Sequence, residues 1–310
     1  MKVINQFING KEYISKSDRF GDVFNPANGE KTKKVSFANS EDVKLAIECA
    51  VEAGKKWAET PPLTRSTVFF KFKDLIKRDM DQLALELTSE HGKILSDSAG
   101  SITRGMEVVE FACGIPHLLK GEYSENVGSD IDSWSMRQPL GVSVGISPFN
   151  FPAMVPMWMF VISIACGNSF ILKPSEKDPT VPYMLAELLK EAGLPDGVFN
   201  VINGDKEAVD LLITDPAVDS VSFVGSTPVA EYIYHTSSKH NKRVQSLGGA
   251  KNHMVVMPDA DLDQVVDGLI GAGYGSAGER CMALSVAVAV GDVGDKLIEK
   301  LTPRVQNLKV

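Results

Sequence analysis

Short apolar runs alternate with amphipathic stretches through the middle of the chain, from Gly141 to Leu247. The apolar runs predict strands at residues 142–146, 169–173, 198–202, 220–224 and 243–247. Helices are predicted between them, at residues 153–165, 181–192 and 229–237, with a shorter one before residue 220. Strands that alternate with helices form parallel sheets through right-handed crossovers. The pattern therefore predicts an α/β fold with a doubly wound parallel sheet, which binds ligands at the carboxyl ends of its strands.

The first third of the chain has a helical pattern. Ser40 is predicted to cap a helix whose first turn is acidic and whose apolar positions fall on one face. Further helices are predicted from Pro62 towards His91 and over residues 103–120. The period then changes, because residues 131–138 alternate apolar and polar side chains, and this alternation predicts a strand.

The pattern also divides the chain into two domains. Residues 1–120 and 140–247 form the predicted first domain, and residues 121–139 form a strand or hairpin outside it. Residues 248–310 begin a second α/β domain, with a strand at 253–257, a helix at 261–272, a strand at 283–290 and a helix at 296–308. About 60 residues are too few for a stable separate core, so we expect this second domain to be incomplete.

Composition and charge exclude several classes of protein. The chain has 310 residues, of which 44% are hydrophobic and 23% charged, which is typical of a globular protein rather than a disordered one. Its formal net charge is −8 and its basic residues are scattered, which argues against a nucleic-acid partner. The four cysteines have no CxxC spacing, so we expect no disulfide framework, no metal site and a reducing compartment.

Membrane attachment is also not expected. Residues 138–172 carry no charged side chain, but prolines and a Gly-Asn pair break this run into pieces too short to span a bilayer. The first residues lack the apolar core and cleavage site of a secretory signal, and no transit peptide is evident. We therefore expect a cytoplasmic protein.

Polar side chains follow three of the predicted parallel strands. Asn150, in Ser147-Pro-Phe-Asn-Phe-Pro152, could donate to a developing oxyanion. Lys173 and Glu176 follow the second strand and could bind ribose hydroxyls, and Ser226 opens a helix whose first amides could meet a phosphate. Each segment alone could equally be a turn or a helix cap. Together, at one edge of a sheet, they indicate a nucleotide site.

Cys281 is the candidate nucleophile. It follows a glycine-flanked segment and stands beside Arg280, whose charge favours the thiolate. The alternative for a single cysteine is an apolar filler of the core.

These segments, together with Gly193-Leu-Pro-Asp-Gly-Val-Phe-Asn-Val-Ile-Asn-Gly204, resemble the aldehyde dehydrogenase superfamily over all 310 residues. Residues 147–159, 249–253 and 278–285 are similar to the CoA-acylating methylmalonate-semialdehyde dehydrogenases within it. The resemblance implies NAD-dependent oxidation of methylmalonate or malonate semialdehyde with loss of CO₂. Coenzyme A would be the co-substrate and propionyl-CoA or acetyl-CoA the product. It also implies a homotetramer, with residues 131–138 in the oligomerisation hairpin, an NAD-binding first domain and a catalytic second domain.

The resemblance also implies roles for single residues. Cys281 would attack the aldehyde, and Asn150 with the Cys281 amide would hold the oxyanion. Hydride loss to NAD would leave a thioester on sulfur. Arg104 and Arg280 would bind the substrate carboxylate, although Arg104 could equally belong to a solvated helix face.

The remaining matched residues would bind NAD. Lys173 and Glu176 would hold the adenosine ribose, and the carboxylate of Glu176 would repel the 2′-phosphate of NADP. The other NAD-binding positions are Ser147, Phe149, Gly225 and Ser226, the last two beside the pyrophosphate. The usual second glycine of that helix start is Ala230 here.

One family residue is absent. Hydrolytic aldehyde dehydrogenases have a glutamate that activates the deacylating water, in the motif Glu-Leu-Gly-Gly-Lys. Its position corresponds here to Leu247 or Ser246, depending on the alignment, and neither is a base. A thiol such as that of coenzyme A needs less activation than water, so the sequence favours a thiol acceptor.

Two other functions stay open. The family continues beyond Val310, so the chain could be the N-terminal part of an enzyme or a short product that binds a nucleotide without turnover. A cysteine hydrolase is the third and weakest reading, because no histidine is identifiable as its base.

Overall fold

The computed structural model describes residues 1–309, which divide into two compact units, the first from Met1 to Gly248 and the second from Gly249 onward. A seven-stranded sheet runs through the first unit. Its order is β12 (Arg243–Leu247), β11 (Val218–Val224), β8 (Val142–Ile146), β9 (Ser169–Lys173), β10 (Phe199–Val201), β2 (Gln6–Ile8) and β3 (Lys11–Tyr13). The first five strands are parallel, so the predicted doubly wound sheet is confirmed. All residues of β8 and β9 are buried, as expected for strands covered on both faces.

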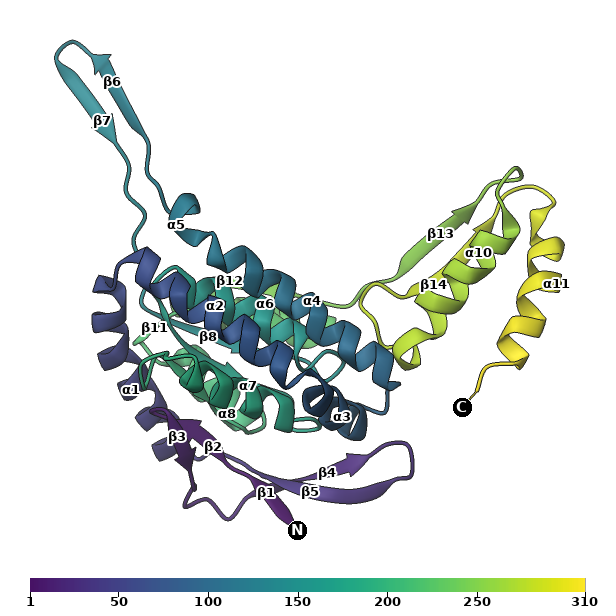
Figure 1. Cartoon of the computed structure of the whole chain (residues 1–310), viewed down its shortest axis with the longest axis horizontal. Coiled ribbons are helices and arrows are strands. Elements are labelled where there is room, and N and C mark those ends of the chain that lie inside the picture. The colour runs from purple at the N-terminus through teal and green to yellow at the C-terminus, as the bar shows by residue number, and fades with distance from the viewer. Residues whose placement is uncertain (310) are drawn as a thin grey trace. The chain divides into compact units, whose positions relative to one another are not determined.

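Helices cover both faces of this sheet (Figure 1). On one face lie α6 (Met154–Ala165) and α7 (Thr180–Glu191). Outside them are α2 (Pro62–Arg78), α3 (Met80–His91), α4 (Leu95–Cys113) and α5 (Ile115–Leu118). The other face is covered by α1 (Ser40–Glu59), α8 (Lys206–Thr214) and α9 (Thr227–Lys239). The helix α6 is apolar on nearly all sides because it is enclosed between the sheet and α4.

The residues before α1 were predicted to belong to a helical region, but they form strands instead. They form β1 (Lys2–Ile4), β2, β3, β4 (Phe20–Asn25) and β5 (Glu30–Ser36), and β1, β5 and β4 make a separate three-stranded sheet. β2 and β3 instead add an antiparallel edge to the main sheet. These strands are short and largely polar, so their alternation is weak. The turn residues between β4 and β5 were a usable signal, because Asn28-Gly29 is typical of a hairpin.

Several other boundaries differ from the prediction, of which three bear on the fold of the first unit. Asn39, not Ser40, caps α1: its side chain accepts a hydrogen bond from the Asp42 amide at 3.0 Å, and the Asp42 carboxylate accepts one from the Asn39 amide at 2.9 Å. The helix α4 begins at Leu95, earlier than predicted. Only part of 131–138 is a strand, β7 (Ile131–Trp134), which pairs with β6 (Tyr123–Gly128) in an exposed hairpin that stands apart from the helices around it (Figure 1).

The second unit has a small core of its own. Its parallel strands β13 (Asn252–Val256) and β14 (Leu284–Ala289) pack with α10 (Leu262–Leu269) and α11 (Val293–Gln306) around Val256, Val266, Leu269, Val293 and Leu297. The predicted helix 261–272 ends at Leu269 and continues as a π-helical turn, Ile270–Tyr274. The division of roles between the two units stays a prediction. Among the described residues of the chain, no helix is long and apolar enough to cross a membrane.

Candidate active site

Three predicted site segments leave the main sheet at one edge. The register pairs Ile146 with Lys173, Phe223 with Ile146, and Val224 with Leu247, so β8, β9, β11 and β12 end together. The amide of Ser147 donates to the carbonyl of Lys173 at 3.1 Å, and the amide of Gly225 to that of Leu247 at 3.1 Å. The structure therefore brings Ser147, Lys173 and Gly225 to the carboxyl edge, where doubly wound sheets bind ligands.

Lys173 and Glu176 form a pair at this edge. Lys173 ends β9 with its side chain only 7% exposed, and its Nζ lies 3.2 Å from Oε2 of Glu176, which is more open to solvent. A fixed ammonium beside a carboxylate offers a donor and an acceptor to neighbouring hydroxyls. This pair suits a ribose diol, and the negative charge of Glu176 would oppose a phosphate there.

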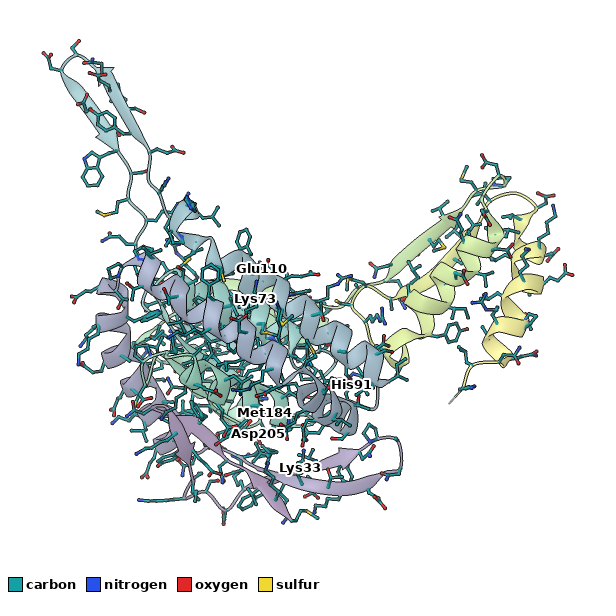
Figure 2. All side chains as sticks on the ribbon, viewed as in Figure 1. Lys33, Lys73, His91, Glu110, Met184 and Asp205 are labelled. Carbon is teal, nitrogen blue, oxygen red and sulfur yellow. The ribbon has the colours of Figure 1, made fainter. Side chains whose placement is uncertain are left out.

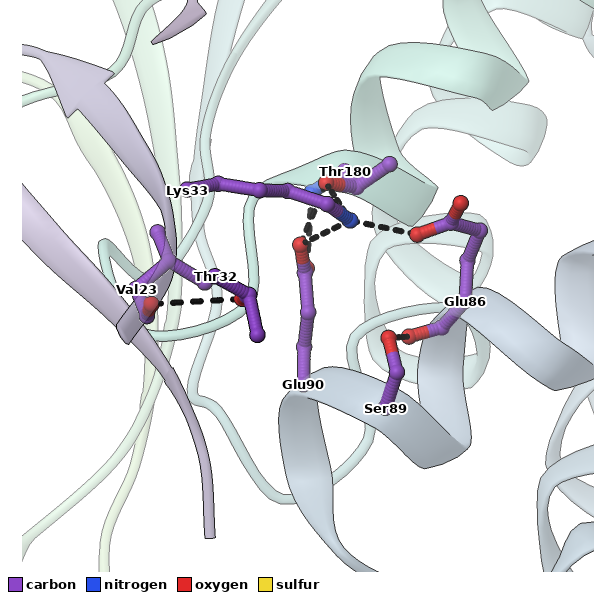
Figure 3. Close-up of polar contacts among 7 residues, drawn as sticks. All are labelled: Val23, Thr32, Lys33, Glu86, Ser89, Glu90 and Thr180. Carbon is purple, nitrogen blue, oxygen red and sulfur yellow. Dashed lines mark hydrogen bonds and ion pairs between the residues drawn. The ribbon is translucent and has the colours of Figure 1, made fainter. Parts of the chain in front are cut away.

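The start of α7, directly after this pair, is anchored from α3 and β5 (Figure 3). The carboxylate of Glu90 accepts from the amide of Thr180 at 3.1 Å and also bonds its hydroxyl. Lys33 Nζ donates to the same carboxylate at 2.8 Å and contacts Glu86. Burial alone would lower the pKa of Lys33, but the charges of Glu90 and Glu86 outweigh it and raise the pKa. Lys33 therefore stays protonated and positively charged at neutral pH.

The segment 147–152 carries the predicted oxyanion donor. Its residue Asn150 is half-buried, and the backbone carbonyl of Asn150 accepts a hydrogen bond from Lys93 Nζ at 2.7 Å. Ser147 is buried, and its hydroxyl has no hydrogen-bond partner among the described residues. A buried hydroxyl without a partner is costly unless a ligand satisfies it. With the Lys173–Glu176 pair, this hydroxyl makes the edge a fitting site for NAD.

The ring of Phe149, beside Asn150, lies near two polar side chains. Its centroid lies 6.3 Å from that of the His91 ring and 4.3 Å from Lys177 Nζ. His91 is buried at the end of α3 (Figure 2). Burial, and then the charge of Lys93, lower the pKa of His91 to about 4. The imidazole is therefore neutral at pH 7 and packs against Phe149 as an uncharged ring.

The phosphate candidate Ser226 stands at the N-cap position of α9, yet its side chain makes no capping hydrogen bond and is exposed. Pro228, in the first turn, has no amide hydrogen to offer. Ala230, where the family usually has glycine, is buried, and its carbonyl accepts from the Ser246 hydroxyl at 2.7 Å. The exposed hydroxyl of Ser226 is thus free to meet a phosphate, with fewer amides around it than is usual.

Cys281 lies in the second unit and is exposed. Shortly before it, Ser276, Ala277 and Gly278 have φ values of 54°, 55° and 74°. The left-handed region costs non-glycine residues roughly 1–3 kcal/mol each and is concentrated at functional sites. Asn252 Nδ2 donates to the carbonyl of Cys281 at 2.8 Å and to that of Ala283 at 3.1 Å, tying the cysteine backbone to the start of β13.

The other three cysteines are partly buried, and burial raises the pKa of each thiol. A raised pKa keeps a thiol protonated and inert. The exposed position after a strained turn therefore distinguishes Cys281 as the reactive candidate. The filler alternative requires burial, which the structure does not show for this residue.

The profile of the aldehyde dehydrogenase family matches residues 13–310. The chain belongs to this family. A malonate-semialdehyde dehydrogenase of Pseudomonas aeruginosa is 55% identical over the whole chain, which spans 62% of that protein. An acylating, mitochondrial methylmalonate-semialdehyde dehydrogenase of Arabidopsis thaliana is 49% identical over 96% of the chain and 49% of its own length. The resemblance read from the sequence is confirmed.

Solved structures of the aldehyde dehydrogenase family agree with the fold. A Sinorhizobium meliloti protein described as a methylmalonate-semialdehyde dehydrogenase, solved with NAD, superposes on the whole chain with a TM-score of 0.98 at 55% identity. The methylmalonate-semialdehyde dehydrogenase of Oceanimonas doudoroffii gives 0.98 at 57% identity. The chain covers 63% of each of these proteins, so it spans less than two thirds of the relatives it matches.

Residues 246 and 247, where the resemblance to the family places the glutamate of hydrolytic members, hold no base. The hydroxyl of Ser246 is bonded to the Ala230 carbonyl, and Leu247 is half-exposed and apolar. Among residues 1–309, no group of three or more His, Cys, Asp or Glu side chains is arranged to hold a metal ion.

The two arginines have different surroundings. Arg104 is exposed on α4, and no hydrogen bond or ion pair joins it to another described residue, which fits a solvated helix face as well as a waiting carboxylate partner. Arg280 is half-buried and its guanidinium lies against Gly275, where a Cβ would stand 2.8 Å from Nη2. Sequence reasoning missed Glu90, His91, Lys93 and Asn252, because each acts through contacts with residues distant in the chain.

Proposed function

We propose that this protein is an NAD-dependent, CoA-acylating aldehyde dehydrogenase. Its substrate would be methylmalonate or malonate semialdehyde, and its products propionyl-CoA or acetyl-CoA and CO₂. The printed names of the relatives support the semialdehyde class, and the structure solved with NAD supports the cofactor. The exposed Cys281 and the Lys173–Glu176 pair supply the parts such a reaction needs.

In the proposed reaction, the thiolate of Cys281 bonds to the aldehyde carbon and the carbonyl oxygen becomes an oxyanion. The side-chain amide of Asn150 and the backbone amide of Cys281 donate hydrogen bonds to that oxygen, which lowers the barrier. Bound NAD supplies a hydride acceptor. Loss of hydride leaves an acyl thioester on Cys281. Arg104 and Arg280 hold the substrate carboxylate until its C–C bond breaks and CO₂ leaves, and the resulting thioester enolate takes a proton from water. The thiolate of coenzyme A then bonds to the acyl carbon, and the thiolate of Cys281 is released.

The observation that carries the choice of coenzyme A over water is the absence of a base at residues 246 and 247. A hydrolytic enzyme needs a carboxylate to activate water, and here those positions hold a bonded serine and an apolar side chain. The thiol of coenzyme A is intrinsically nucleophilic and partly ionised near neutral pH. The thioester would therefore accumulate until a thiol arrives.

The test is to mix the protein with NAD and either semialdehyde, with and without coenzyme A, and to follow NADH by absorbance. We expect steady turnover with coenzyme A and, without it, a burst of at most one NADH per active site. Undiminished turnover without coenzyme A refutes the thiol acceptor. NAD binding with no turnover in either case refutes the enzyme and supports a nucleotide-binding module.

We also propose a homo-oligomer, a tetramer by family resemblance, built through the β6–β7 hairpin. Tyr123, Val127, Ile131 and Trp134 are all more than half exposed on this hairpin, a cluster that water solvates poorly. The test is Trp134→Glu followed by sedimentation: smaller particles support the hairpin as the contact, and an unchanged mass opposes it.

A further inference from the structure

The segment that ends α3 lies behind two of the site loops. Glu90 bonds Thr180 at the start of α7, and His91 packs its ring near Phe149. Gly92 then ends the helix with φ 87°, a conformation that favours glycine, and this turn carries the chain to Lys93. One four-residue segment thus supports both the loop that follows β8 and the loop that follows β9.

Lys93 contacts the backbone of the proposed oxyanion donor, Asn150. Lys93 is only 2% exposed, its Nζ donates to the Asn150 carbonyl at 2.7 Å, and the same ammonium stands 4.1 Å from the ring centroid of Phe151. A buried ammonium is costly unless strong partners compensate it. The charge-assisted hydrogen bond and the cation–π contact are such partners, and both belong to residues 150 and 151.

We propose that Lys93 is a positioning residue for the Asn150 amide. An oxyanion donor must be held within about 0.5 Å of its productive place, which requires support from surrounding groups. Lys93 fixes the peptide that follows Asn150, and with it the direction from which the side-chain amide leaves the backbone. The inference rests on the proposed oxyanion role of Asn150. It adds a residue that acts through Asn150 rather than on the substrate itself.

The chain offers a matched control in Lys242. This lysine is also buried, 7% exposed, and its Nζ donates to the backbone carbonyls of Val218 at 2.7 Å and Asp215. Those carbonyls lie at the amino end of β11, away from the edge that carries the site. Lys242→Met therefore removes the same kind of contact without touching the segment 147–152.

The experiment compares the Lys93→Met and Lys242→Met variants of the whole protein, at the length found in its source cell. We expect Lys93→Met to slow the formation of NADH in the first turnover about 10- to 100-fold. The affinity for NAD should change less than about threefold. Lys242→Met should lower the melting temperature but keep that rate within about twofold. An equal slowing in both variants overturns the proposal, and if Lys93→Met does not fold, Lys93→Gln, which keeps a neutral donor, replaces it.

A double-mutant cycle with Asn150→Ala separates positioning from a general structural role. If Lys93 acts through Asn150, Lys93→Met costs much less rate in the Asn150→Ala background than alone. Additive losses overturn the proposal. Asn150→Ala with an unchanged rate instead refutes the oxyanion role. Hydrogen exchange then decides on Lys93, because faster exchange of amides 147–152 in Lys93→Met, and not in Lys242→Met, supports positioning, and equal exchange overturns it.

Discussion

The sheet edge of the first unit and the turn around Cys281 in the second are built in opposite ways. The edge is held from behind by buried charged groups: Lys93 holds Asn150, and Glu90 with Lys33 holds the start of α7. Cys281 is exposed and follows a turn with left-handed residues at Ser276, which is buried, and Ala277, and the side-chain amide of Asn252 donates to the Cys281 carbonyl. This difference agrees with the roles proposed above, because a cofactor site needs a fixed surface, whereas a nucleophile must reach its substrate.

Removing the nucleophile gives the largest expected effect. Cys281→Ala should lower NADH formation by at least roughly 10³-fold, because no other exposed thiol is available among the described residues, while NAD affinity stays unchanged. Stopped-flow absorbance measures the first, and fluorescence titration the second. Cys113→Ala is the control and should keep full activity. Turnover retained in Cys281→Ala would show that Cys281 is not the nucleophile and that its exposure has no catalytic purpose.

Loosening the anchored region should cost stability. Lys33→Met leaves the carboxylate of Glu90, whose side chain is 1% exposed, buried without its cation, and should lower the free energy of unfolding by about 3–5 kcal/mol. The same change at Lys31, whose ion pair with Asp22 at 2.6 Å is open to water, should cost about 0–1 kcal/mol. Urea titrations measure both. Equal losses of unfolding free energy in the two variants would show that the buried Lys33–Glu90 pair stabilises the fold no more than the open Lys31–Asp22 pair.

The pH dependence of stability reports on His91. Its pKa of about 4 in the folded chain lies below the ordinary value of 6.5, so the unfolded chain binds the proton more readily between these values. Stability is therefore present above pH 6.5 and is lost as the pH falls towards 4. The loss should be about 2 kcal/mol, less than the full shift because some solvent reaches the ring.

The measurement is the difference between wild type and His91→Gln in urea titrations at pH 7 and pH 4.5. Asp178, also buried nearby, has a pKa raised by burial and by the charge of Glu90, so its effect runs the opposite way and cancels in that difference. If the two proteins lose stability equally on acidification, His91 is not the group that titrates.

The smallest effect concerns choice between cofactors. Glu176→Gln removes the negative charge near the proposed ribose site but leaves Lys173 and the anchors of α7 in place. The ratio of kcat/KM for NADP to that for NAD should rise about tenfold, which corresponds to about 1.4 kcal/mol. The steady-state rates with each cofactor provide the measurement. An unchanged ratio would mean that Glu176 does not face the 2′-position.

Much of the fold was readable from the sequence where the pattern was strong. β8, β9 and β12 begin and end where the pattern predicts. β8 and β9 lie inside the sheet and are buried throughout, whereas β12 forms its edge and alternates exposed with half-buried side chains. The polar N-terminal strands were missed, since β5 has few buried side chains to mark its period. Asn39 replaced Ser40 as the cap because both residue types serve, and only the backbone angles decide between them.

The candidate site divides in the same way. Asn150, Lys173, Glu176 and Cys281 were named from local segments, because strand ends and glycine-flanked turns leave a mark in the sequence. Their supporting residues were not, since Lys93 meets Asn150 across 57 positions and Glu90 meets Thr180 across 90. The exposure of Cys281 and the burial of the other thiols also required the folded chain.

The sequence by itself therefore determined the family, the parallel sheet and the residue types proposed to carry the chemistry, because periodicity and short motifs are local properties of a chain. Tertiary structure alone decided which carbonyl Lys93 holds, which helix Glu90 caps and how burial lowers the pKa of His91. These depend on desolvation and on distances of a few ångströms between segments far apart in sequence, and neither quantity exists until the chain has folded.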